Sequence, residues 1–113
     1  MHEYGLVEGI LERVEEEGRS RGATSAKKVY VSVGALAGVE PVLLIRAFET
    51  FRARTLCADA TLEVRQVAAR WACTTCTAPV LPSARLRCGT CGSPARLVEG
   101  GELILDRIEL ELP

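Results

Sequence analysis

The first twenty residues carry apolar side chains at the spacing of an amphipathic helix. The apolar positions follow the i, i+3, i+4, i+7 pattern of one buried helical face: Val7, Ile10, Leu11 and Val14. Four glutamates cover the opposite side: Glu8, Glu12, Glu15 and Glu16. We therefore expect a helix from Tyr4 to about Arg21, where nearby glycines favour a helix end.

A different pattern follows this helix. Apolar and polar residues alternate over residues 29–33, which predicts a strand. Pro41 suits the first turn of a second helix because its missing N–H would have no partner there. Glu40, just before it, would place an anion at the positive end of that helix. Apolar residues at helical spacing extend this second helix to about Arg54.

Two further strands are expected at residues 60–69 and 102–112. In each strand the apolar side chains change face part of the way along, which predicts a bulge or bend near Arg65–Gln66 in the first and a slip between Leu105 and Ile108 in the second. The pattern therefore predicts an α+β fold. Two helices should pack on a small three-stranded sheet, and a cysteine-rich segment is inserted between the second and third strands.

The inserted segment carries the clearest chemistry in the chain. Four cysteines form two C-x-x-C pairs with eleven residues between the pairs: Cys73, Cys76, Cys88 and Cys91. Two intervening residues let one tight turn aim both sulfurs at one point, and four thiolates match the tetrahedral ligand set of zinc. Gly92 can adopt positive φ after the second pair, whereas Thr77 follows the first pair. We expect a structural Zn(II) site, with all four ligands from protein; two disulfides or a redox pair are the alternatives.

Composition limits the classes of protein that this chain can belong to. Its 113 residues, 48% hydrophobic, suit one domain or a small domain with a smaller insert. The net charge of −1 disfavours a generic nucleic-acid binder, and no apolar run approaches the roughly 20 residues of a membrane span. The N-terminus lacks the pattern of a secretory signal, so the five cysteines indicate a reducing cytosol. The fifth, Cys57, is expected to be a buried free thiol.

The charge is unevenly distributed along the chain. Four arginines and no acidic residue lie between Arg70 and Arg96. These arginines either balance the formal −2 of a Zn(Cys)4 centre or form a binding surface. Because Trp71 lies at the base of the same segment, the alternative function is a zinc-ribbon module that binds nucleic acid or a transcription complex.

The chain opens with Met1-His2-Glu3, which contains its single histidine. The α-amine of Met1 and the amide nitrogen and imidazole of His2 can surround one metal ion, and such N-donor sets suit Ni(II) or Cu(II). Glu3 could add its carboxylate or its amide nitrogen. A mobile terminus with no role is the alternative. No sequence feature pairs a nucleophile with a base or sets two carboxylates together, so we expect a carrier rather than an enzyme.

Along its whole length, the chain resembles the HypA/HybF family, the nickel metallochaperones of [NiFe]-hydrogenase maturation. The matching residues are Met1-His2-Glu3, Val33-Gly34, Val39-Glu40, Ala47-Phe48-Glu49 and the two cysteine pairs. The resemblance implies a structural Zn(II) on Cys73, Cys76, Cys88 and Cys91. It also implies a separate, weaker nickel site at Met1, His2 and Glu3. Some members add an acidic side chain from the turn before the second helix, and the matching position here is Glu40.

The resemblance also carries expectations about organisation and partners. Residues 1–69 plus 97–113 would form the nickel-binding α/β domain, and residues 70–96 the zinc-binding domain. A cytoplasmic monomer or homodimer would receive Ni(II) as cargo and work with a nickel-handling GTPase (HypB) and the hydrogenase large subunit. In some organisms the family also serves urease, through urease accessory protein. Neither nucleic acid nor membrane is an expected partner.

Overall fold

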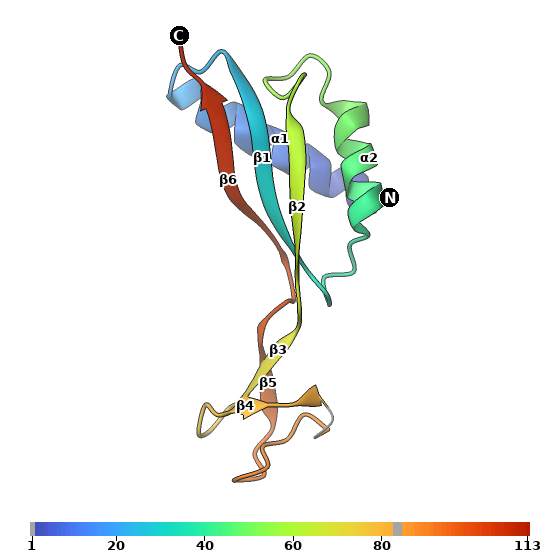
Figure 1. The fold of residues 1–113 in the computed structure, drawn as a ribbon, viewed down its shortest axis with the longest axis vertical. Helices are drawn as coiled ribbons and strands as arrows, with labels where there is room; N and C mark the ends of the chain where they lie inside the picture. Colours follow the sequence, from blue (N-terminus) through green and yellow to red (C-terminus); the bar gives the residue numbers. More distant parts are fainter. Residues whose placement is uncertain (1, 83–84) are drawn as a thin grey trace.

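The computed structural model describes residues 2–82 and 85–113, and Figure 1 shows an elongated molecule of two parts. Its principal extents are 56 × 28 × 16 Å. The elements, in chain order, are α1 (His2–Ser20), β1 (Ser25–Gly34), α2 (Pro41–Phe51), β2 (Thr61–Val67), β3 (Arg70–Cys73), β4 (Pro79–Val80), β5 (Ala95–Glu99) and β6 (Leu103–Glu111). Neither helix in the described part is long and apolar enough to cross a membrane.

The larger part, here called the body, comprises α1, α2 and a three-stranded sheet with the strand order β2-β1-β6. Strand β1 runs parallel to β2 and antiparallel to β6. Both helices cover one face of this sheet, and α1 crosses behind it in Figure 1. The α+β fold expected from the sequence, with two helices on a three-stranded sheet, is confirmed.

The core of the body lies between the helices and the sheet. The apolar stripe of α1 is buried as its spacing predicted, and α2 adds Leu44, Ala47 and Phe48. These side chains pack against the inward residues of β1, which are Val29, Val31 and Val33. Full burial of each large aliphatic or aromatic side chain contributes roughly 1.5–3 kcal/mol, so the matching apolar faces hold the helices on the sheet.

The smaller part, here called the cysteine module, comprises residues 70–99. Its antiparallel sheet has the strand order β4-β3-β5. A separate small core contains Cys73, Val80 and Cys88, with Trp71 and Ala95 packed against it. Strand β5 runs from Ala95 to Glu99, so the sheet of this module extends three residues beyond residue 96, the expected end of the zinc-binding domain.

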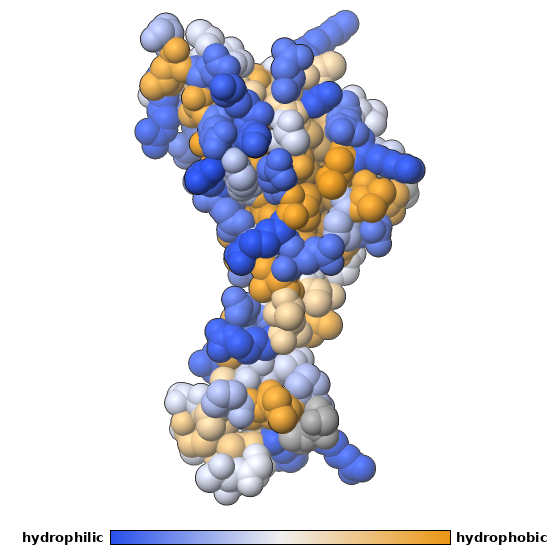
Figure 2. Space-filling view, in the orientation of Figure 1, coloured by the Kyte–Doolittle hydropathy of each residue, from blue (hydrophilic) through white to orange (hydrophobic). Residues whose placement is uncertain are grey.

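A narrow waist joins the body to the cysteine module, as Figure 2 shows. A Cβ on Gly34 would lie 2.2 Å from the backbone carbonyl of Gly100. The two backbone segments can therefore approach this closely only because residue 34 has no side chain. Gly100 has φ +95° and would itself meet the carbonyl oxygen of Ala68 at 2.7 Å if it carried a Cβ. The N–H of Leu36 donates to the carbonyl of Gly100 at 2.8 Å. Both connecting segments are thus packed against the loop between β1 and α2.

The strand irregularities differ in part from the prediction. Of the bulge or bend expected near Arg65–Gln66, the bulge is wrong, because the pairing of β1 with β2 is continuous from Thr61 to Val67. The apolar phase changes because the chain leaves the body sheet at residues 68–69 and enters β3. The slip expected in the last strand is confirmed, because the register of β6 against β1 changes at Asp106: Arg107 pairs with Tyr30, but Leu105 pairs with Val31.

Candidate metal sites

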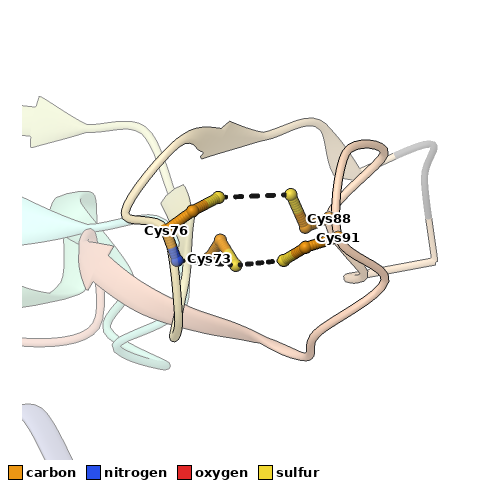
Figure 3. Close-up of side chains that lie close together, drawn as sticks. All are labelled: Cys73, Cys76, Cys88 and Cys91. Atoms are coloured by element: carbon orange, nitrogen blue, oxygen red, sulfur yellow. Dashed lines mark hydrogen bonds between the residues drawn. The ribbon is translucent and has the colours of Figure 1, made fainter.

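Four cysteine side chains converge at the far end of the cysteine module (Figure 3). Their sulfur atoms all lie within 4.8 Å of one another. The Sγ atoms of Cys73 and Cys91 are 3.4 Å apart, and those of Cys76 and Cys88 are 3.6 Å apart. In residues 2–82 and 85–113 this is the only group of three or more His, Cys, Asp or Glu side chains gathered closely enough to hold a metal ion.

Each cysteine pair lies on a turn built in the same way. The N–H of Thr77 donates to the carbonyl of Cys73 at 3.2 Å, and the N–H of Gly92 donates to that of Cys88 at 2.9 Å. The residue after each pair adopts positive φ, 63° at Thr77 and 75° at Gly92. The positive φ expected at Gly92 is confirmed. Thr77 adopts the same conformation, which is strained for a β-branched residue.

Backbone N–H groups also point at the sulfur atoms. Cys73 Sγ accepts from the N–H of Thr75 at 3.3 Å and of Cys76 at 3.4 Å, and Cys88 Sγ accepts from the N–H of Thr90 at 3.4 Å. Hydrogen bonds of this kind favour the thiolate over the thiol. The two turns therefore offer preorganised, partly charged sulfur ligands.

The pKa values of the cysteines follow from these contacts. The N–H groups of Cys91 and then Thr90 lower the pKa of Cys88 to about 6. The N–H of Cys76, followed by that of Thr75, lowers the pKa of Cys73. For Cys76 the N–H of Ala78 lowers the pKa, but the facing sulfurs of Cys73 and Cys88 together raise it to about 11. Four thiolates this close repel one another and need a cation between them.

Side chains that the sequence analysis did not select join the two turns. The hydroxyl of Thr74 donates to the carbonyl of Pro94 at 2.8 Å, and the hydroxyl of Thr75 donates to the hydroxyl of Ser93 at 2.8 Å. These bonds fix one cysteine pair against the other. The residues are eighteen to twenty positions apart in the chain, and no periodicity or motif marks them in the sequence.

The cysteine cluster fits a tetrahedral thiolate-bound metal. Zinc–sulfur bonds of about 2.3 Å place neighbouring sulfurs about 3.8 Å apart, close to the separations of 3.4 and 3.6 Å. Two of the four cysteines are buried and two are exposed. A closed site of four protein thiolates is typical of structural zinc.

The N-terminal residues lie against the start of α2. His2 is the first described residue of α1 and is exposed, and Met1 lies outside the described residues. The N–H of Glu40 donates to the Glu3 carboxylate at 3.2 Å, while the Glu40 carboxylate accepts from the N–H of Val42 at 3.3 Å and caps α2. The N–H of Glu40, then that of Glu3 itself, lowers the pKa of Glu3. The Glu3 carboxylate thus contacts the backbone at Glu40, whereas the Glu40 carboxylate is turned to α2, and within the described residues the structure does not gather His2, Glu3 and Glu40 into one group of possible ligands.

An aromatic contact holds the same end of α1 against α2. The rings of Tyr4 and Phe51 lie edge to face, with centroids 5.1 Å apart and planes at 89°. Such pairs add roughly 0.5–1.5 kcal/mol beyond their burial. The helix therefore begins at His2 in a position fixed by the contacts of Glu3 and Tyr4.

The fifth cysteine lies in the body, away from the cluster. Cys57 is fully buried, and its N–H donates to the hydroxyl of Thr55 at 3.0 Å. Burial, and then the charge of Glu15, raise the pKa of Cys57 to about 11. A buried thiol with a raised pKa is unreactive, which agrees with the free core cysteine expected from the sequence.

Comparison with known proteins matches nearly the full length of the chain to one family. A family model described as "Hydrogenase/urease nickel incorporation, metallochaperone, hypA" matches residues 1–110. A hydrogenase maturation factor HypA from Wolinella succinogenes is 37% identical over 98% of this chain and 96% of the relative. Another from Bradyrhizobium sp. is 40% identical over 90% of this chain and 91% of the relative.

Solved structures agree with the sequence comparisons. The solution structure of the Ni metallochaperone HypA from Helicobacter pylori matches with a TM-score of 0.76 and 27% identity, over 98% of both chains. A second structure, titled as the solution structure of HypA protein, matches with a TM-score of 0.82 and 29% identity over 97% of this chain and 96% of the other. The expectation of a carrier rather than an enzyme is confirmed by this match. The chain belongs to the HypA family of metallochaperones for nickel incorporation into hydrogenase and urease.

Proposed function

We propose that this chain binds Ni(II) at its N-terminus and delivers it during maturation of [NiFe]-hydrogenase. The observation that carries the proposal is the family match over residues 1–110, together with the Met1-His2-Glu3 start. The proposed ligands are the amine of Met1, the amide nitrogen and imidazole of His2, and Glu3. The hydrogen bond from the N–H of Glu40 to the Glu3 carboxylate holds the start of α1 beside the turn before α2, from which the Glu40 carboxylate could join the site.

The helical start suits a site built from backbone nitrogens. The first four N–H groups of an α-helix have no acceptor within the helix. The amide nitrogens of His2 and Glu3 can therefore lose their protons to a strongly bound metal without breaking a helical hydrogen bond. The negative charge of the Glu3 carboxylate would favour a divalent cation at this end of α1.

We infer that zinc is the resident metal of the cysteine cluster. Cys73, Cys76, Cys88 and Cys91 would hold it, and bound zinc would supply the positive charge that keeps four thiolates together. Its role would be structural, because no ligand position is left for water. On this proposal the cysteine module, residues 70–99, is the zinc-binding domain, which takes in the expected residues 70–96 and the end of β5. The body, residues 1–69 plus 100–113, is the nickel-binding domain, in place of the expected 1–69 plus 97–113.

Delivery requires a site that can surrender its metal. Ligands at a chain terminus can leave the ion one at a time, and protons compete for the amine, amide and imidazole. Nickel affinity should therefore fall as pH falls. The partners we propose are the nickel-handling GTPase HypB and the hydrogenase large subunit, with urease accessory protein where urease is served. Free thiolate ligands need a reducing compartment, which supports a cytoplasmic location.

Nickel titration of zinc-loaded protein tests this proposal. Calorimetry and optical absorption should give one Ni(II) per chain, and His2→Ala should lose it. A variant with one extra residue ahead of Met1 should also lose it, because the α-amine is displaced. Glu63→Gln, which changes an exposed carboxylate on β2, is the matched control and should bind like the native chain. Equal binding by all variants, or by none, would refute the terminal site.

A further inference from the structure

The two cysteine turns are built alike but differ at one position. In the first turn, residues 73–78, and in the second turn, residues 88–93, the N–H of the first cysteine donates to the carbonyl five residues later, at 2.8 and 2.9 Å respectively. Both turns place the residue after their second cysteine in the left-handed region, Thr77 with φ 63° and Gly92 with φ 75°. Glycine adopts this conformation freely, whereas a β-branched residue does so only under strain. The first turn is therefore strained and the second is not.

The side chain of Thr77 does little to offset this strain. It is exposed, and in the described part of the chain its hydroxyl donates only to the carbonyl of the neighbouring Cys76, at 2.6 Å. The N–H of Thr77 closes the turn on the carbonyl of Cys73 at 3.2 Å, which is longer than the matching bond of 2.9 Å from Gly92. Replacing Thr77 would thus remove no buried contact and no hydrogen bond to a sulfur.

Strain in this turn acts on metal binding because the cysteine module has little else to order it. Its small core contains only Val80 besides two of the four cysteines, with Trp71 and Ala95 packed against it. Folding of so small a core is coupled to binding of its metal. Thr77 is free to leave the left-handed region when the module unfolds and is held there when the four sulfurs converge. The strain therefore subtracts from the free energy of metal binding.

The exposure of the ligands indicates which one leaves first. The four sulfurs face one another (Figure 3), but only Cys76 and Cys91 are exposed. Cys76 directly precedes the strained Thr77, whereas Cys91 directly precedes Gly92. Of the two exposed ligands, only Cys76 relieves backbone strain when it moves away from the cluster.

We propose that Thr77 is a positioning residue that lowers the metal affinity of the cysteine cluster and makes Cys76 the first ligand to leave. This inference rests on the proposed function of the cluster as the site of a resident metal. Backbone strain that persists at a binding site is a feature from which a functional role can be inferred. Here it gives the site one defined side for metal exchange, the exposed end of the first turn.

Competition for Zn(II) against a chromogenic chelator tests the effect on affinity in the full-length chain. Thr77→Gly should bind Zn(II) about three- to tenfold more tightly than the native chain. Thr77→Asn should fall between them, because asparagine tolerates positive φ better than threonine. Gly92→Thr should bind at least about threefold more weakly. Thr90→Gly, at an exposed position of the second turn outside the left-handed region, is the matched control and should bind no more tightly than the native chain.

Alkylation of the Zn(II)-loaded chain with N-ethylmaleimide, followed by mass spectrometry, tests which ligand leaves first. In the native chain Cys76 should be modified at least about threefold faster than Cys91. Exchanging the two residues, Thr77→Gly with Gly92→Thr, should reverse this order because the strain then lies beside Cys91. A general change in the stability of the module would speed or slow both cysteines and would not exchange their order.

Two results would overturn this inference. One is a Thr77→Gly variant that binds Zn(II) no more tightly than the native chain, and the other is a native chain in which Cys91 reacts as fast as Cys76. Absorption of Co(II)-loaded protein separates these results from failure of the proposed zinc site, because thiolate ligands give Co(II) intense sulfur-to-metal charge-transfer bands. A native chain without these bands would overturn the resident-metal proposal together with this inference. Bands in every variant with equal affinities would overturn this inference alone.

Discussion

At the scale of single residues, Glu3 shows how the fold controls a charge beside the proposed nickel ligands. Its carboxylate accepts the N–H of Glu40 at the positive end of α2, and its pKa is lowered, chiefly by that N–H. A carboxyl group whose pKa is lower in the folded state stabilises the fold at pH values above its ordinary pKa, which is about 4.3. This contribution disappears as pH falls through the lowered value.

At pH 7, Glu3→Gln should therefore melt up to a few degrees below the native chain. Near pH 2 the two chains should melt at nearly the same temperature. Glutamine keeps the shape of the side chain but carries no charge for the α2 terminus. Thermal melts followed by circular dichroism at both pH values make the comparison. Glu8→Gln, at an exposed position on α1, is the control. A constant offset between Glu3→Gln and the native chain at both pH values would contradict the electrostatic explanation.

The sequence was informative at the residue scale where chemistry has a fixed spacing. The four cysteines and the positive φ of Gly92 could be predicted, because a tight turn needs two intervening residues and a flexible exit. The bonds from Thr74 and Thr75 to the second turn could not. They depend on how two distant turns approach each other, which local spacing does not specify.

At the scale of elements, the N-terminal half of α1 is weaker than its length suggests. Gly9 lies inside the helix, and nothing lies within 4 Å of the Cβ that a substitution would add. Glycine in a helix interior costs roughly 0.5–1 kcal/mol relative to alanine. Gly9→Ala should therefore raise the free energy of unfolding by about that amount, measured by urea denaturation. An unchanged or lower value would show that the position is constrained by something other than helix propensity.

In the waist, a glycine-to-alanine substitution should lower the free energy of unfolding rather than raise it. A Cβ on Gly34 would lie 2.2 Å from the backbone of Gly100, and neither backbone segment can move freely. Gly34→Ala should destabilise the chain by about 1–3 kcal/mol or more, as overpacking does. A Gly34→Ala variant as stable as the native chain would show that the two connecting segments can separate without cost.

Periodicity predicted the elements better than the breaks between them. The buried stripe of α1 and the proline start of α2 were confirmed because both depend on local residue order. The change of apolar phase after Val64 was interpreted as a bulge or bend within one strand, although the chain there passes from one sheet to another. The same kind of signal in β6 is a true register shift at Asp106. A phase change alone does not distinguish the two cases, since both reverse the buried face.

At the scale of the whole molecule, two cores are joined only through the waist. The core of the body contains side chains from both helices and the three-stranded sheet. The small core contains two cysteines of the proposed zinc site and few apolar side chains. A core of that size cannot offset the entropy of ordering about thirty residues. The cysteine module should therefore depend on its metal, while the body should not.

Removing the metal should unfold the cysteine module but not the body, and two spectroscopic signals can follow the two parts in one experiment. Trp71 is the only tryptophan and packs in the small core, so its fluorescence reports the cysteine module alone. Both helices lie in the body, so circular dichroism at 222 nm reports mainly that part. Chelation should shift Trp71 emission to longer wavelength and leave most of the 222 nm signal, and Zn(II) should reverse the shift. Equal loss of both signals would mean that the waist couples the parts into one cooperative unit.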